Sequence, residues 1–141
     1  MEYTGQLKLL IERANVFSGR DMHVTVVANP VAGGFTQKHR ISENRQYVEE
    51  AVERVKNRPV RTRSCSIVTH FTNAAGHAGA LAKAVFFEAE KDKNPSALYL
   101  LITAGGDGTS LEAQSAFTQE VLVSGKKDLI DRVCFIRMPF G

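Results

Sequence analysis

The sequence has little of what marks several classes of protein. Only two cysteines occur among 141 residues, Cys65 and Cys134, and no Cys-x-x-Cys or Cys/His cluster suggests a zinc site. Each cysteine lies in an apolar, strand-like run, so we expect two reduced and mostly buried thiols. The longest apolar run, residues 97–104, is far too short to span a bilayer.

The sequence also has no large excess of either positive or negative charge. The formal net charge is +3, and the basic clusters are small: residues 38–40, and Arg58 with Arg61 and Arg63. They are too short and too poor in aromatics to predict nucleic-acid binding, but they suit a solvated surface, phosphate or an anionic membrane. Residues 1–6 carry an early acid and no basic n-region, which argues against a signal peptide. We expect a cytoplasmic protein, with a peripheral position at the inner membrane surface as the alternative.

Strand-like and helical patterns alternate along the chain. Short apolar, β-branched runs predict four strands, at 23–28, 64–69, 98–103 and 133–138. Helical spacing predicts helices at 4–17, about 48–55, 75–91 and about 110–122. Ser42 or Asn44 can cap the second helix. This order predicts a three-layer α/β fold with a mostly parallel sheet and helices on both faces.

The leading helix lies outside this alternation. We therefore divide the chain into a leading amphipathic helix with its linker, residues 1–20, and a domain at 21–141. The apolar stripe of the leading helix is narrow, so we expect it to lie against the sheet. Pairing of two chains into a homodimer and contact with a membrane are the alternatives.

Glycine and small polar residues follow the predicted strands. The connections at 29–34, 70–73, 104–109 and 139–141 all begin at the carboxyl end of a strand. In a parallel α/β sheet these ends meet along one edge, where ligands bind. The sequence therefore predicts one binding edge built from several loops.

The connection at 105–109, Gly-Gly-Asp-Gly-Thr, is the most informative of the four. Glycines there permit positive φ angles and close approach of a ligand to the main chain. Thr109 or Ser110 can cap the following helix, whose first turn then directs free N–H groups at a phosphate. Asp107 would repel phosphate and needs another partner: magnesium, a hydroxyl or the amides of the loop itself. A plain Asp-Gly hairpin turn is disfavoured, because residues 110–114 continue as helix.

The other connections are weaker signals. Asn29 can hydrogen-bond a sugar or phosphate, and Gly33 and Gly34 open the backbone beside it. The sequence supports an ordinary loop here equally well. Thr72 can serve either as a ligand or as a helix cap. No Walker A motif occurs, and Leu111 stands where a dinucleotide fingerprint needs its third glycine. The four histidines share no metal-ligand spacing, so we expect structural or surface roles for them.

Three segments together resemble a known family. Residues 29–34, Asn-Pro-Val-Ala-Gly-Gly, resemble the Asn-Pro-x-Ser-Gly opening of the diacylglycerol kinase and sphingosine kinase catalytic domain. Thr72 followed by Gly-His-Ala at 76–78 is similar to the family's second element. The loop at 105–109, with Glu112 three residues on, is similar to its signature loop.

The end of the chain extends the resemblance to residues 23–141. Met-Pro-Phe-Gly at 138–141 is similar to the start of the motif Pro-x-Gly-Thr-Gly-Asn-Asp. The resemblance implies an N-terminal α/β domain that holds ATP with Mg²⁺, and a β-rich lipid-binding domain that is absent here. It also implies phosphorylation of a lipid hydroxyl at a membrane surface, in the cleft between the two domains.

Carried over residue by residue, the resemblance implies an ATP site that includes Asn29, Pro30, Gly33, Gly34, Thr72, Gly105, Gly106, Asp107, Gly108, Thr109, Ser110, Leu111 and Glu112. Asp107 would position the substrate or the metal, the general base would lie beyond Gly141, and no metal ligand is assigned firmly.

The sequence also departs from the family. Ala32 stands in place of the usual serine, and the asparagine usually found just before Glu112 is missing. The chain ends inside the fourth motif, so we expect a fragment that is inactive alone. An NAD kinase, which shares the glycine-aspartate loop, and a non-catalytic nucleotide-binding module are the alternative functions.

Overall fold

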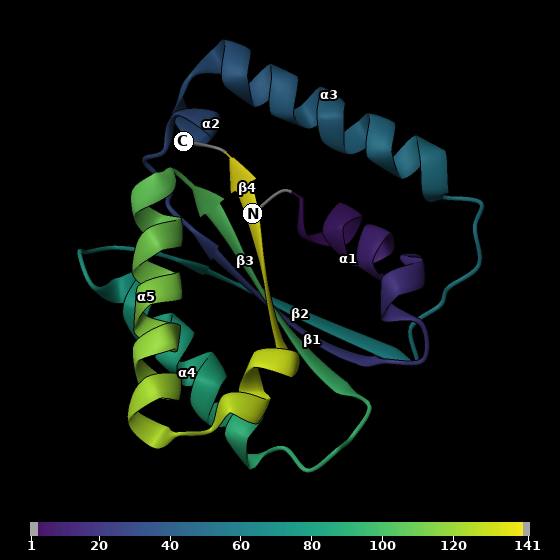
Figure 1. Ribbon diagram of the computed structural model, residues 1–141. Helices are drawn as coiled ribbons and strands as arrows, with labels where there is room; N and C mark the ends of the chain where they lie inside the picture. Colours follow the sequence, from purple (N-terminus) through teal and green to yellow (C-terminus); the bar gives the residue numbers. More distant parts are fainter. Residues whose placement is uncertain (1–2, 140–141) are drawn as a thin grey trace.

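Four parallel strands form the central sheet of the computed structural model, which describes residues 3–139 (Figure 1). The strands are β1 (Asp21–Ala28), β2 (Ser64–Phe71), β3 (Ala97–Gly105) and β4 (Val133–Pro139). Their order in the sheet is β2-β1-β3-β4, so β2 and β4 are the edges. In this register Val24 lies between Ile67 and Leu100.

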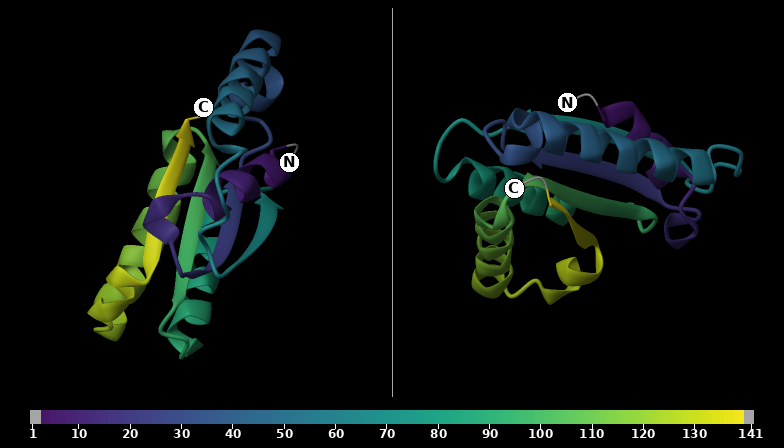
Figure 2. Two further views of the ribbon diagram at one scale, coloured as in Figure 1. Left: turned by 90° about the vertical axis from the view of Figure 1, so that its right-hand side faces the viewer. Right: turned by 90° about the horizontal axis from the view of Figure 1, so that it is seen from above.

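Helices cover both faces of the sheet, which confirms the predicted three-layer α/β fold (Figure 2). The helical elements are α1 (Thr4–Glu12), η1 (Asn15–Phe17), α2 (Gly33–Thr36), α3 (Lys38–Val55), α4 (His77–Lys91), α5 (Asp107–Ser124) and η2 (Lys127–Asp131). α4 and α5 lie on one face, and α1, α2 and α3 lie on the other (Figure 2). No helix in the described part of the chain is long and apolar enough to cross a membrane.

The core consists of two apolar layers, one on each face of β3. Every residue of β3 is buried, as its nearly all apolar sequence predicts for a strand covered on both faces. Leu101 points to the α4 and α5 side, where Phe86 and Phe117 pack edge to face at 5.7 Å. Leu100 points to the α1 side. Each fully buried side chain of this size contributes about 1.5–3 kcal/mol.

The leading helix lies on the sheet, as expected, but it is shorter than predicted. Leu7 and Ile11 of α1 belong to the same apolar layer as the inner strands. The helix ends at Glu12, because Ala14 has an extended backbone (φ −76°, ψ 126°). A separate 3-10 turn, η1, then carries Phe17 back into the core.

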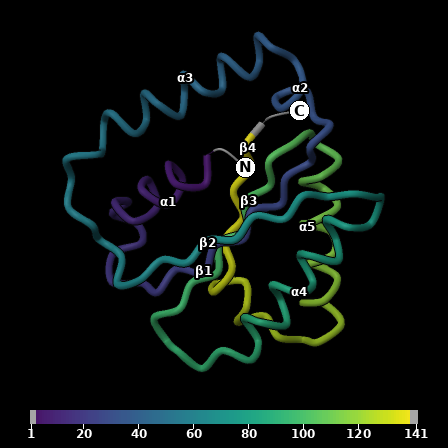
Figure 3. The backbone as a smooth tube through the Cα atoms, turned by 180° about the vertical axis from the view of Figure 1, so that it is seen from behind, coloured from purple at the N-terminus to yellow at the C-terminus, as the bar shows by residue number. Residues whose placement is uncertain are grey.

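α3 is longer than predicted, and its proposed caps are wrong. It begins at Lys38 after Gln37, with no side chain capping its first turn. Ser42 and Asn44 are therefore inside the helix, and the amide of Asn44 donates instead to the Gly34 carbonyl at 3.4 Å. α3 contacts α1 and α2, and α1 lies between it and the strands (Figure 3).

Candidate functional site

The ends of β1, β2 and β3 meet at one edge of the sheet through backbone hydrogen bonds. The Asn29 amide donates to the Ala104 carbonyl at 2.9 Å, and the Thr72 amide donates to the Ala28 carbonyl at 2.9 Å. A cleft of about 650 Å³ opens where these connections meet. It is lined by Asn29, Pro30, Val31, Thr72, Asn73, Ala74, Ala75, Ala78, Gly108, Thr109 and Glu112.

The cleft gathers about half of the site residues predicted from the sequence. Those that line it are Asn29, Pro30, Thr72, Gly108, Thr109 and Glu112. Those that do not line it are Gly33, Gly34, Gly105, Gly106, Asp107, Ser110 and Leu111. Sequence reasoning did not select five residues that line the cleft: Val31, Asn73, Ala74, Ala75 and Ala78. Four of them are apolar and give no chemical signal, whereas the Asn73 amide could have been noticed.

Asn29 and Thr72 first of all shape their own loops. The Asn29 side-chain oxygen accepts from the Val31 amide at 3.2 Å, which forms a local turn. The Thr72 hydroxyl donates to the Ala28 carbonyl at 3.4 Å. The cap role considered for Thr72 is wrong, because α4 begins only at His77, after Gly76.

The glycines of the third connection are needed for space rather than for positive φ. Among the described residues only Gly19, Gly76 and Gly125 have positive φ, so that expectation is wrong for the loop at 105–109. A Cβ on Gly105 would lie 3.1 Å from the Thr109 hydroxyl oxygen. A Cβ on Gly108 would meet no atom within 4 Å. Gly105 therefore permits close packing, and Gly108 leaves the cleft open.

Gly33 and Gly34 do not form an open loop. They begin the short helix α2, and Gly34 is buried. A Cβ on Gly33 would lie 2.6 Å from a guanidinium nitrogen of Arg40. The Arg40 side chain is flexible and can move, so this contact alone does not require glycine. Because both glycines lie in a helix, the expected role of opening the backbone is wrong.

The first turn of α5 borders the cleft. The helix begins at Asp107 after Gly106, so Thr109 and Ser110 are inside the first turn and do not cap it as predicted. The first N–H groups of a helix have no carbonyl partner within that helix, and they carry its positive dipole end. Those of Gly108 and Thr109 belong to residues that line the cleft. This turn therefore suits an anion such as a phosphate.

Asp107 finds its partner in Arg137 of β4. The two side chains form an ion pair, with the carboxylate largely exposed and the guanidinium about half exposed. Arg137 was missed from the sequence, although it is the one charged residue in an otherwise apolar strand. The pair places a positive group beside the carboxylate, which lowers the repulsion that Asp107 would exert on a phosphate at α5.

Glu112 has a different environment at the neighbouring helix. Its carboxylate accepts from the Gly79 amide at 3.5 Å, in the first turn of α4. A negative side chain in this position is stabilised by the helix dipole. The first turn of α4 is thus served by a carboxylate of the protein itself, whereas that of α5 borders the open cleft.

The cleft can take Mg²⁺ only together with other ligands. No group of three or more histidine, cysteine, aspartate or glutamate side chains suited to a metal occurs in residues 3–139. Mg²⁺ at nucleotide sites commonly keeps water and binds one or two carboxylates together with phosphate oxygens. Of the two carboxylates of the predicted site only Glu112 lines the cleft, so an ion there would depend mainly on phosphate oxygens and water.

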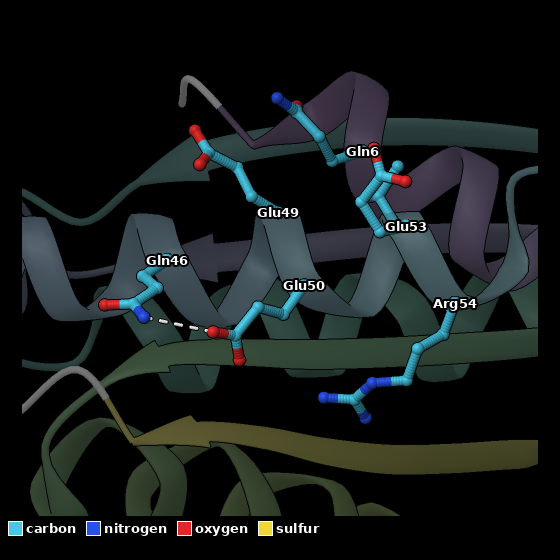
Figure 4. A pocket seen from close by; sticks show the side chains of 7 residues that line it. Gln6, Gln46, Glu49, Glu50, Glu53 and Arg54 are labelled. Carbon is cyan, nitrogen blue, oxygen red and sulfur yellow. Dashed lines mark hydrogen bonds between the residues drawn. The ribbon is translucent and has the colours of Figure 1, made fainter.

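A second groove, of about 660 Å³, lies between α1 and α3 (Figure 4). Gln6 of α1 and Glu53 of α3 both line it, and the Gln46 amide donates to Glu50 at 3.0 Å. None of the residues that line the groove belongs to the predicted site. It offers carboxylates but no helix terminus or glycine loop, so the cleft is the better candidate.

Comparison of the sequence with models of protein families and with curated proteins finds no match. What the cleft does must therefore be inferred from its residues and their geometry.

Proposed function

We propose that this chain is the nucleotide-binding part of an ATP-dependent lipid kinase of the diacylglycerol kinase type. Residues 21–141 would form the ATP-binding domain, and the lipid-binding domain would lie outside this chain. One observation supports the proposal above the others: three of the segments that resemble this family, 29–34, 72–78 and 105–112, each contribute residues to one cleft at the first turn of α5. A helix N-terminus beside glycine is suited to a polyphosphate.

Different residues of the cleft would contact different parts of MgATP. The amides of Gly108 and Thr109 would bind phosphate oxygens, and Arg137 would offset the charge of Asp107 nearby. Asn29 and Thr72 line the same cleft and would contact the remainder of the nucleotide. Bound Mg²⁺ would neutralise phosphate charge, and catalysis would consist mainly of positioning the transferred group.

Gly108 offers a direct test, because a side chain there would enter the cleft without meeting its walls first. A Cβ on Gly108 meets no atom within 4 Å, and the same is true of Gly5 in α1. We expect Gly108→Leu to weaken MgATP binding at least about ten-fold by filling the phosphate position. Gly5→Leu, the matched control, is expected to leave the affinity unchanged.

Isothermal titration gives the affinities, and thermal melting confirms that both variants fold. Equal MgATP affinity in Gly108→Leu and the wild type would remove the α5 turn from the site. Failure of the wild-type chain to bind millimolar MgATP would contradict the proposal for this part of the protein.

The acceptor needs a separate experiment on a chain that continues into a lipid-binding domain. Diacylglycerol is expected to take the phosphate from ATP, measured by transfer of labelled phosphate to lipid. Transfer to NAD instead would reject the lipid kinase and leave the nucleotide site intact.

A further inference from the structure

Two basic segments far apart in the sequence lie side by side at the amino-terminal ends of β1 and β2 (Figure 1). They are residues 13–20, which include η1, and residues 56–63, which connect α3 to β2. The Arg61 amide donates to the Glu12 carbonyl at 2.6 Å, and the Gly19 amide donates to the Arg61 carbonyl at 2.9 Å. These hydrogen bonds fix the two segments as one surface, which we call the basic corner.

The basic corner concentrates the positive charge of the protein. Its cations are Arg13, Arg20, Lys56, Arg58, Arg61 and Arg63. The two segments hold six of the 18 Lys and Arg residues and none of the 15 Asp and Glu residues, so the rest of the chain carries a formal charge of −3. The protein therefore has one strongly positive end.

Most of this charge is not neutralised by the protein itself. Lys56 pairs with Glu53, and Arg63 lies 3.5 Å from Asp21. Within residues 3–139 the other four cations of the basic corner have no carboxylate within ion-pair distance. A field of this kind attracts anionic surfaces.

Unsatisfied polar atoms gather at the same place. Across the described part of the chain, three buried side-chain atoms lack a hydrogen-bond partner: Arg13 Nε, Arg20 Nε and Thr62 Oγ1. All three belong to the basic corner. Arg13 and Arg20 are held by single bonds to the Leu9 and Ala97 carbonyls, so their guanidinium groups stay in place without an acidic partner. These three atoms are themselves buried, so they show only that Arg13 and Arg20 lack an acidic partner within the described residues, and the exposed cations are the ones that can meet an outside partner.

Two apolar side chains are exposed in the same segments. Val16 of η1 is 78% exposed and Val60 is 52% exposed. A single exposed valine is ordinary, but valines set among unpaired cations match the composition of surfaces that bind membrane interfaces. Cations attract the lipid headgroups and the apolar side chains enter the boundary beneath them. A small soluble anion would make no use of the valines.

We propose that the basic corner docks on an anionic lipid bilayer. It lies at the opposite end of the strands from the cleft, so it acts as a tether and does not depend on the proposed nucleotide site. The exposed acids of α3, among them Glu49 and Glu50, belong to the part of the chain with net negative charge. Repulsion from the bilayer would keep that part turned outward.

Vesicle sedimentation tests the docking. The wild-type chain is expected to bind vesicles of phosphatidylcholine and phosphatidylglycerol in equal parts but not vesicles of phosphatidylcholine alone. The bound protein should dissociate as the salt concentration rises. Removal of each cation weakens binding about five-fold, so Arg58→Gln/Arg61→Gln should bind about 25-fold more weakly. Lys38→Gln/Lys127→Gln removes the same charge elsewhere and should change binding less than about two-fold.

The valines distinguish a bilayer from a soluble anion. Val16→Ser/Val60→Ser is expected to weaken vesicle binding while melting at the wild-type temperature. Equal losses in the two charge-removal pairs would show attraction by net charge alone and would overturn the proposal. So would full displacement of the vesicles by inorganic phosphate at matched phosphate concentration, or a valine pair that binds like the wild type.

Discussion

Replacement of Gly105 by alanine would test whether the cleft depends on close packing behind it. The new Cβ would lie 3.1 Å from the Thr109 hydroxyl oxygen and 3.2 Å from the Asn29 Cβ. Both separations are shorter than ordinary van der Waals contact, so one neighbour must move. Asn29 is held by the hydrogen bond from its backbone amide to the Ala104 carbonyl, and Thr109 belongs to the first turn of α5. We therefore expect Gly105→Ala to lower the free energy of unfolding by about 1–3 kcal/mol, the usual cost of overpacking.

Gly108→Ala is the matched comparison, since the added methyl group meets nothing. Alanine is favoured over glycine in a helix, so this variant should be as stable as the wild type or more stable by up to about 1 kcal/mol. Urea unfolding of both variants measures the difference. Thr109→Ala removes the hydroxyl and leaves a Cβ at 3.5 Å from the added methyl. It should therefore recover part of the loss in the double variant.

The outcome that refutes this reasoning is specific. Wild-type stability in Gly105→Ala would show that the strand end and the α5 turn separate freely. Strict additivity of Gly105→Ala and Thr109→Ala would show that the two residues do not press on each other, since contacting residues usually couple by 0.5 kcal/mol or more, as a rough guide.

Two further predictions concern carboxylates. Glu112→Gln keeps an acceptor for the Gly79 amide but removes the negative charge at α4, so urea unfolding should show a loss of about 0.3–1 kcal/mol; a gain would contradict the assigned role. Hydrogen bonds from Asn94, and secondarily from Ser64, lower the pKa of Asp21 below its usual value. Its contribution to stability is thus present above the unfolded-state pKa of about 4 and is lost as pH falls through the lower folded-state pKa. Asp21→Asn should unfold more easily at neutral pH and show a flatter loss in acid; identical pH profiles would refute this.

The fold was largely predictable because its signals are local and repeated. The apolar run at 97–104 reads as a strand buried on both faces, and β3 is that strand. The helices were predicted less well where few of their side chains are buried. The first half of α3, residues 38–47, is polar and packs weakly, so it leaves no hydrophobic period to detect. α2 was missed because Gly33 and Gly34 suggest a loop.

The position of the candidate site in the fold was predictable, but the contacts between its residues were not. The rule for parallel sheets brings the loops after β1, β2 and β3 to one edge, which the hydrogen bond from Asn29 to Ala104 illustrates. The pairing of Asp107 with Arg137 joins residues 30 positions apart in the sequence, and only the packing of β4 beside β3 brings them together. The sign of φ at a glycine is likewise set by its surroundings.

Two helices begin beside the cleft, and the difference between them would set the orientation of the proposed nucleotide. The first turn of α4 already faces the carboxylate of Glu112, so a phosphate there would meet a negative charge at close range. The first turn of α5 has Asp107, but Arg137 offsets it. In the proposed complex the phosphates would lie at Gly108, and the sugar and base would lie toward Thr72. A nucleotide turned the other way would set its triphosphate against the Glu112 carboxylate and leave the free amides of α5 unused.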